Sequence, residues 1–188
     1  MLGKTELKVY SISAVSNIPP FVIWGLALVF GVGCAILVLR KGWKKGLRVS
    51  AVLLLVEWIV FILCSAIIFR DVRVERDFNL IPFDSYFHYP PDSYFIEVAT
   101  VNVLNIIMFI PLGLLLGLGF RVMTWKKVLL IGLGISFSIE LLQFFFKKGL
   151  CETDDLIHNL LGCLLGYAIY KLTLRLIRYV QTFFQTSV

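Results

Sequence analysis

Five long apolar runs, each bounded by short clusters of charged residues, constrain this chain more than any other feature of its sequence. A run of about 18 or more apolar residues predicts a helix that crosses a membrane. Lipid cannot satisfy the backbone groups of an open strand, so helices are the expected form. Only 16% of the residues are charged, whereas a soluble domain carries about 25%. We therefore expect an all-α, polytopic membrane helix bundle with about five transmembrane helices, at residues 21–39, 49–69, 98–120, 128–146 and 156–174.

The charged clusters between these runs divide the chain into regions. The longest stretch without an apolar run is expected to form an outer loop at residues 70–97. The other expected regions are an N-terminal tail with an extra leading helix and a basic cytoplasmic loop at 1–48, a four-helix membrane domain at 49–174 that contains the outer loop, and a cytoplasmic tail at 175–188.

Lysine and arginine are divided unequally between the two sides of the expected bundle. Eleven follow the first, third and fifth apolar runs, and seven lie on the opposite side. Cytoplasmic loops are enriched in these residues, so we expect the N-terminus outside and the C-terminus in the cytoplasm. Because the basic residues flank apolar runs, lipid headgroups explain the net charge of +6, and we expect no nucleic-acid partner.

An ionisable residue, Glu140, lies inside the fourth expected span. Such a residue costs about 2.5–3.5 kcal/mol on insertion scales unless it has a partner or water. Gln143 lies three positions after Glu140 and Ser136 four before it, so the three share one helix face. We expect this face to point at protein rather than lipid. For Glu57, in the second span, a contact to this cluster or to Asn102 and a structural hydrogen bond both remain open.

The fifth expected span begins with a second polar face. Asp155 and Asn159 are four positions apart, and Gly162 and Gly166 continue the same face. The polar part lies at the outer end of the span, and the glycines lie further in. Small residues at this spacing let a neighbouring helix approach closely.

The third expected span carries Asn105 in its outer third, followed by Pro111 and Gly113. Pro111 cannot donate to the carbonyl of Ile107, which leaves one backbone acceptor free. Polar groups thus fall at similar depths on three consecutive helices. We infer that one outward-opening polar pocket beneath residues 79–83 contains Asn105, Glu140, Gln143, Asp155 and Asn159. The alternative is polar contact between helices that only holds the bundle together.

These motifs resemble those of the VanZ-like membrane proteins, a family named for a teicoplanin-resistance accessory protein. The resemblance covers about residues 49–171 and rests on three blocks, at 79–83 (Asn-Leu-Ile-Pro-Phe), 105–113 and 136–166. Each block is weak alone, and the combination is specific. The pocket and motif residues that it marks are Asn79, Pro82, Phe83, Asn105, Phe109, Pro111, Gly113, Ser136, Glu140, Gln143, Asp155, Asn159, Gly162 and Gly166.

The chain departs from the family pattern in one loop. Many VanZ-like proteins carry an arginine before the Asp-x-x-x-Asn motif, where this chain has Lys147 and Lys148. The role of that arginine is therefore in doubt unless a lysine replaces it. The resemblance implies residence in the bacterial cytoplasmic membrane and suggests a role in tolerance to lipid-tailed glycopeptide antibiotics.

Three kinds of function remain open from the sequence. We favour a non-enzymatic envelope protein whose pocket binds a lipid-linked cell-wall component or an acylated glycopeptide in the outer leaflet. The second is a membrane enzyme in which Glu140 and Asp155 act on a lipid-linked headgroup, although no nucleophile or metal motif accompanies them. The third is a small proton-coupled transporter. We expect no cofactor and no metal, since Asp154 and His158 form only half a metal site, and the oligomeric state is left open.

Overall fold

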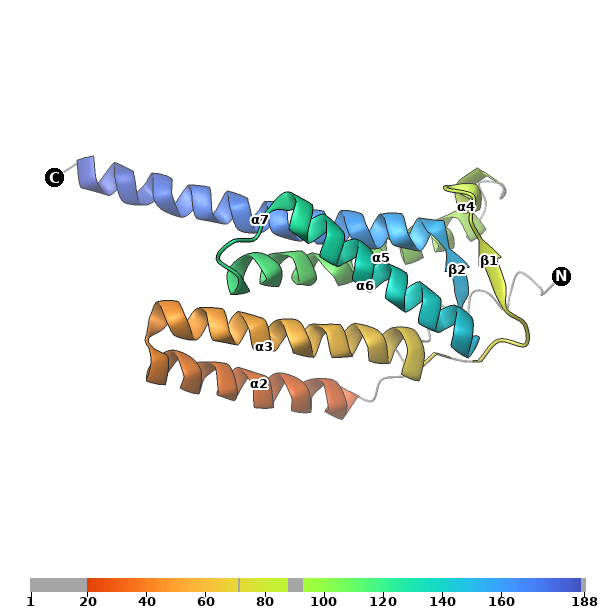
Figure 1. Cartoon of the computed structure of the whole chain (residues 1–188), viewed down its shortest axis with the longest axis horizontal. Helices are drawn as coiled ribbons and strands as arrows, with labels where there is room; N and C mark the ends of the chain where they lie inside the picture. Colours follow the sequence, from red (N-terminus) through yellow and green to blue (C-terminus); the bar gives the residue numbers. More distant parts are fainter. Residues whose placement is uncertain (1–19, 71, 88–92, 187–188) are drawn as a thin grey trace.

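A computed structural model describes residues 20–70, 72–87 and 93–186 of the chain, apart from the side chains of 20–26, 77, 85, 87, 93–97 and 186. Long helices lie side by side, and two short strands and a helical turn lie together at one end of them (Figure 1). We call this end the strand end. The elements are α2 (Pro20–Lys41), α3 (Trp43–Leu63), the π-helical turn η1 (Cys64–Ile68), β1 (Asp77–Asn79), α4 (Asp84–Phe87), α5 (Ser93–Gly119), α6 (Trp125–Phe146), β2 (Leu150–Glu152) and α7 (Thr153–Thr186).

The prediction of an all-α membrane bundle is confirmed. Within the described residues, four segments are long and apolar enough to cross a bilayer. The first expected span, 21–39, falls within α2, which packs against α3. α7 runs on to Thr186 rather than ending near residue 174, and its last part extends beyond the other helices (Figure 1). The four segments are Trp43–Ile68, Val98–Gly119, Trp125–Phe146 and Thr153–Gln185.

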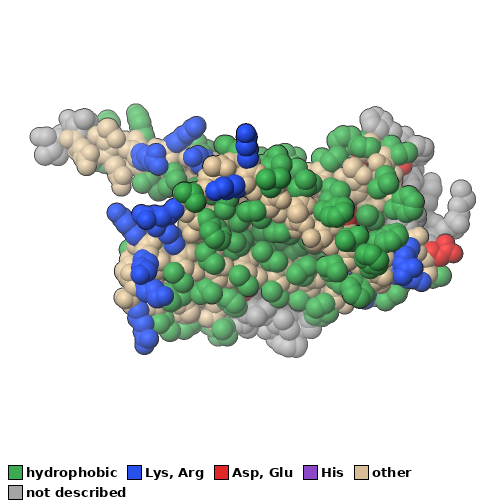
Figure 2. All heavy atoms as spheres, viewed as in Figure 1, with side chains coloured by type: hydrophobic (Ala, Val, Ile, Leu, Met, Phe, Trp, Pro, Cys, Tyr) green, Lys and Arg blue, Asp and Glu red, His purple; other side chains and the backbone are tan. Residues whose placement is uncertain are grey.

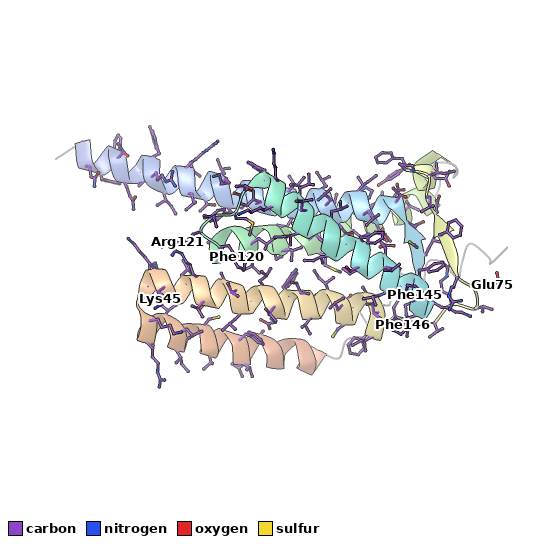
Figure 3. All side chains as sticks on the ribbon, viewed as in Figure 1. Lys45, Glu75, Phe120, Arg121, Phe145 and Phe146 are labelled. Atoms are coloured by element: carbon purple, nitrogen blue, oxygen red, sulfur yellow. The ribbon has the colours of Figure 1, made fainter. Side chains whose placement is uncertain are left out.

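The surface of the bundle has the pattern of a protein surrounded by lipid. On the face shown in Figure 2, apolar side chains are spread along the bundle, and most Lys and Arg side chains gather toward the end opposite the strands. Lys45, Phe120 and Arg121 lie at that opposite end, whereas Glu75, Phe145 and Phe146 lie at the strand end (Figure 3). An apolar girdle between two charged ends is typical of membrane-spanning bundles.

The ends of the helices follow local backbone chemistry. Gly42 has a φ of 75°, which separates α2 from α3 and allows the two to pack antiparallel. α6 ends where Lys147 adopts a left-handed conformation with a φ of 56°. The amide of Lys148 then donates to the carbonyl of Gln143 at 2.8 Å, which closes the last turn of the helix. The chain turns at once toward β2.

α5 packs mainly against α7 through backbone-to-backbone contact. A Cβ atom at Gly162 would collide with the carbonyl of Ile106, and one at Gly166 with the carbonyl of Ile110. From the other side, a Cβ at Gly113 would collide with the carbonyl of Cys163. The expected small-residue surfaces of these two helices therefore face each other, as close packing of membrane helices requires.

A two-stranded parallel sheet, which the sequence analysis did not predict, joins residues 77–79 to the segment that leads into α7. Asp77 pairs with Leu150, Phe78 with Cys151, and Asn79 with Glu152. Each pairing links residues more than 70 positions apart. The sheet thereby holds residues 77–79 beside the N-terminus of α7, where the polar residues of that helix lie.

Candidate functional site: a polar cavity at the strand end

A cavity of about 80 Å³ lies between α3, η1, α5, α6 and α7. We call it the polar cavity. All five residues that we expected in one pocket line it, although they come from three different helices. Phe109 also lines it. The full lining consists of Ile62, Ser65, Ala66, Arg70, Val101, Leu104, Asn105, Met108, Phe109, Ile139, Glu140, Gln143, Asp155 and Asn159.

Hydrogen bonds connect the two carboxylates of the lining to neighbouring elements. The side-chain amide of Asn105 donates to Oδ1 of Asp155 at 2.6 Å, which links α5 to α7. The backbone amide of Glu152 donates to Oε2 of Glu140 at 3.1 Å, which links β2 to α6. One oxygen of each carboxylate therefore has a partner from another element.

The two amide side chains of α6 and α7 are each anchored by their nitrogen. Gln143 donates to the carbonyl of Ala66 at 3.2 Å. Asn159 donates to Oγ of Ser136 at 3.0 Å, so Ser136 positions a lining residue without lining the cavity itself. Ala66 belongs to η1, and single π-helical turns are frequent at functional sites.

Three buried polar atoms of the lining have no hydrogen-bond partner within the described part of the chain. They are Nε of Arg70, Oε1 of Gln143 and Oδ1 of Asn159. An unpartnered buried polar group costs about 1–3 kcal/mol. Such a cost is tolerated more readily where a ligand or water completes the bonding.

Arg70 is the main lining residue that the sequence analysis missed. It directly follows the second apolar run, which was the signal available in the sequence. A Cβ atom added to Gly149 would lie 3.0 Å from an Nη atom of Arg70 and 3.4 Å from Cδ of Gln143, so the guanidinium sits over Gly149 beside Gln143. From there its charge acts on Glu140, Glu152 and Asp155.

Lys147 and Lys148, in the loop before β2, do not line the cavity and instead bond to backbone carbonyls. Nζ of Lys148 donates to the carbonyl of Arg70 at 2.6 Å. Nζ of Lys147 donates to the carbonyl of Val74 at 3.3 Å. Both ammonium groups therefore attach to the backbone between η1 and β1, and the guanidinium at the cavity comes from Arg70.

The expectation that the pocket lies beneath residues 79–83 is only partly matched, because none of these residues lines the cavity. Asn79 donates to Asp84 at 3.1 Å and accepts from the amide of Ile81 at 3.2 Å, which makes a local turn. Pro82 is exposed. The backbone amide of Phe83 donates to Oδ1 of Asp154 at 2.5 Å, so the segment is attached one residue before Asp155.

The remaining motif residues have structural positions. Gly113, Gly162 and Gly166 lie where α5 and α7 touch. Pro111 lies inside α5, and Nε1 of Trp58 donates at 2.8 Å to the carbonyl of Met108, next to the acceptor at Ile107 that proline leaves without its helical donor. These residues shape the bundle around the cavity and do not enter it.

A second polar chain runs beside the cavity. The amide of Asn102 donates to the hydroxyl of Tyr86 at 2.6 Å, and that hydroxyl lies 3.2 Å from Nε2 of His158. Nδ1 of His158 lies 2.6 Å from the carbonyl of Asp154. Both ring nitrogens thus have protein partners, and the described residues contain no group of three or more potential metal ligands. Asn102 contacts Tyr86 and not Glu57, which is partly exposed on α3.

Glu152, outside the membrane-spanning segments, sits in an acidic environment. Burial raises its pKa to about 8, with the carboxylates of Asp155 and Asp154 acting in the same direction and Arg70 and Arg73 opposing. The folded protein thus holds this proton more tightly than the unfolded chain, where the value is near 4.5. The resulting stabilisation is fully present below pH 4.5 and is lost as the pH rises through about 8.

We expect Glu152→Gln to flatten the pH dependence of stability above pH 6, because glutamine keeps the uncharged state at every pH. Between pH ~6 and ~9 the apparent unfolding temperature of the detergent-solubilised wild type should fall by several degrees more than that of the variant. The exposed Glu75 is the matched control, and Glu75→Gln should retain the wild-type slope. Parallel curves for wild type and Glu152→Gln would contradict the raised pKa.

Comparison with known proteins agrees with the motifs. The family described as VanZ/LLP1 matches residues 49–176 of this chain. The chain belongs to this family. The curated relative named Protein VanZ, from Enterococcus faecium, is 32% identical over 99 residues, which are 53% of this chain and 55% of that protein. The chain thus spans about half the length of this relative, and no solved structure matches it.

The VanZ/LLP1 match locates the polar cavity within the part that defines the family. Every lining residue, from Ile62 to Asn159, falls inside the matched range. The match to the family also confirms the resemblance that we inferred from the three motif blocks. α2 lies before the match and packs against α3, as an addition to the VanZ/LLP1 region.

Proposed function

We propose that this VanZ/LLP1 protein lowers susceptibility to lipid-tailed glycopeptide antibiotics by binding the polar part of an outer-leaflet component in the polar cavity. The observation that carries the proposal is the set of three unpartnered buried polar atoms around that cavity. Buried polar atoms normally have partners. The residues that carry these three atoms line the cavity, so a ligand that binds there and meets those atoms supplies the bonds that the protein does not.

The size of the cavity limits what enters it. Pockets that enclose a drug-sized ligand measure about 300–1,000 Å³, and this cavity measures about 80 Å³. A whole glycopeptide antibiotic is therefore too large, whereas a small headgroup fits. We infer that any effect on an acylated antibiotic is indirect, through a component of the leaflet in which its lipid tail anchors.

We propose that the strand end faces the outside of the cell, with the N-terminus outside and the C-terminus in the cytoplasm. The basic loops that follow α2 and α5 lie together at the opposite end (Figure 2). Eleven Lys and Arg residues belong to that side against seven on the other, as the positive-inside rule requires of the cytoplasmic side. The polar cavity then opens near the outer leaflet.

The test of function is antibiotic susceptibility. We expect expression of the full chain in a susceptible bacterium to raise the minimum inhibitory concentration of teicoplanin. Vancomycin lacks the lipid tail and should be affected much less. Glu140→Gln, which removes one carboxylate of the lining with little change in shape, should abolish most of the rise.

The control separates the cavity from membrane carboxylates in general. Glu57 is a second carboxylate inside a span, on α3, and it does not line the cavity. Glu57→Gln should keep the protection at equal membrane expression. If wild type gives no protection, the proposal fails, and if Glu140→Gln protects as well as wild type, the cavity is not responsible.

A membrane enzyme is the second candidate, because Glu140 and Asp155 line one cavity and could serve as acid and base. The thiol of Cys151, beside Glu140, is an unsuitable nucleophile because burial, first among several causes, raises its pKa and favours the unreactive thiol. Mass spectrometry of lipid extracts from cells with and without the protein decides the matter. A new or depleted lipid that disappears with Glu140→Gln would establish this candidate instead.

A further inference from the structure

The unpartnered atoms of the polar cavity specify the chemistry of a ligand. Oε1 of Gln143 and Oδ1 of Asn159 are acceptors, and the two side chains are only 3% and 5% exposed. Nε of Arg70 is a donor with a positive charge. The complementary ligand offers at least two N–H or O–H donors and, beside them, one acceptor that favours a guanidinium.

The charges of the lining point to a cationic donor. Glu140 and Asp155 supply two carboxylates, and Arg70 supplies one guanidinium. When both carboxyls are ionised, these three side chains leave a single negative charge. Buried carboxylates without compensation are unfavourable, so a positively charged group is favoured beside Glu140 and Asp155.

The lining also combines polar and apolar residues, as a site for an amphiphilic ligand requires. Seven of its fourteen residues are polar and seven are apolar. Leu104, one of the apolar ones, is 44% exposed, so the apolar side of the lining continues onto the lipid-facing surface of α5. A headgroup that remains attached to its acyl chains can therefore enter from the membrane.

We propose that the polar cavity binds the primary ammonium of a phospholipid headgroup, with Gln143 and Asn159 accepting its N–H groups and Arg70 donating to the adjacent phosphate. The ammonium supplies the missing donors and places a positive charge beside the two carboxylates, and guanidinium groups favour phosphate oxygens. This inference rests on the binding role proposed above and names its ligand class.

The experiment uses the purified full chain in maltoside micelles and four probes. Dihexanoyl phosphatidylethanolamine carries the primary ammonium. Its choline analogue has the same tails and phosphate but no N–H donor, its glycerol analogue has no cation, and free ethanolamine has no phosphate or tails. We expect only the ethanolamine lipid to raise the apparent unfolding temperature by several degrees, since a ligand that binds only the folded state stabilises it.

Variants then locate the binding. Glu140→Gln should weaken binding of the ethanolamine lipid by about tenfold or more, as expected for a lost hydrogen bond or contact to a charged group. Glu57→Gln, outside the lining, should bind as wild type does. The series of probes on the wild-type protein decides the proposal even if Glu140→Gln does not fold.

Each result bears on the inference separately from the antibiotic effect. Equal shifts with the choline or glycerol lipid overturn recognition of an ammonium. An equal shift with free ethanolamine overturns the requirement for phosphate and a lipid. No shift with any probe means that the cavity does not bind this headgroup, which overturns this inference. Protection against teicoplanin, if observed, would still support the proposed function.

Discussion

Gly166→Leu is expected to prevent the bundle from forming. At this position α5 and α7 approach so closely that even a Cβ atom would collide with the carbonyl of Ile110. Overpacking a core commonly costs about 1–3 kcal/mol when side chains can move aside. Here the opposing atom is backbone, so we expect a loss above that range, of more than about 3 kcal/mol.

Membrane extracts of a fluorescent fusion measure this result. Gly166→Leu should give little monodisperse protein, and any that remains should unfold about 6 °C or more below the wild type. Gly134 on α6 is the matched control, because no atom lies within 4 Å of its Cβ position. Gly134→Leu should extract and unfold like the wild type. Normal behaviour of Gly166→Leu would show that α5 and α7 are further apart than described.

Arg70→Met is expected to destabilise the strand end and to remove function together. The change removes a guanidinium that acts on all three of Glu140, Glu152 and Asp155. Removing one partner from a buried ionic cluster costs about 3–5 kcal/mol, and we expect the lower value because Arg70 is partly exposed. The loss should be largest above pH ~8, where Glu152 is ionised in the wild type, and smaller at lower pH, where its carboxyl is protonated.

Thermal unfolding in detergent at pH ~9 and ~6 measures this effect, with a drop of about 6–12 °C expected at the higher pH. Arg70→Met combined with Glu140→Gln should recover part of the loss, because the second change removes one of the unbalanced carboxylates. The exposed Arg121, at the opposite end (Figure 3), provides the control, and Arg121→Met should have little effect. A double variant with strictly additive losses would argue against a charge interaction.

The polar faces of the helices could be predicted because helix geometry is local. Glu140 and Gln143 share a face whatever the rest of the chain does, and so do Asp155 and Asn159. The high cost of polar groups in lipid then requires those faces to turn toward protein. The structure brings these four residues, together with Asn105, to one cavity.

The outer loop could not be placed in the same way. The two strands pair residues such as Asn79 and Glu152, which neither helix period nor hydrophobicity relates. The attachment of Phe83 to Asp154 likewise joins distant segments. The sequence analysis therefore expected residues 79–83 over the pocket itself. In the structure, hydrogen bonds attach them to β2 and the start of α7, and they do not line the cavity.

By itself the sequence determined that the chain forms a membrane helix bundle and which residues face its interior, because burial in lipid penalises polar groups and helices repeat every few residues. Only the tertiary structure decided which cation joins the carboxylates. Arg70 reaches them because η1, the lysine contacts of the outer loop and the β1–β2 pairing converge at one end of the bundle. Such contacts depend on the whole fold and leave no periodic signal in the chain.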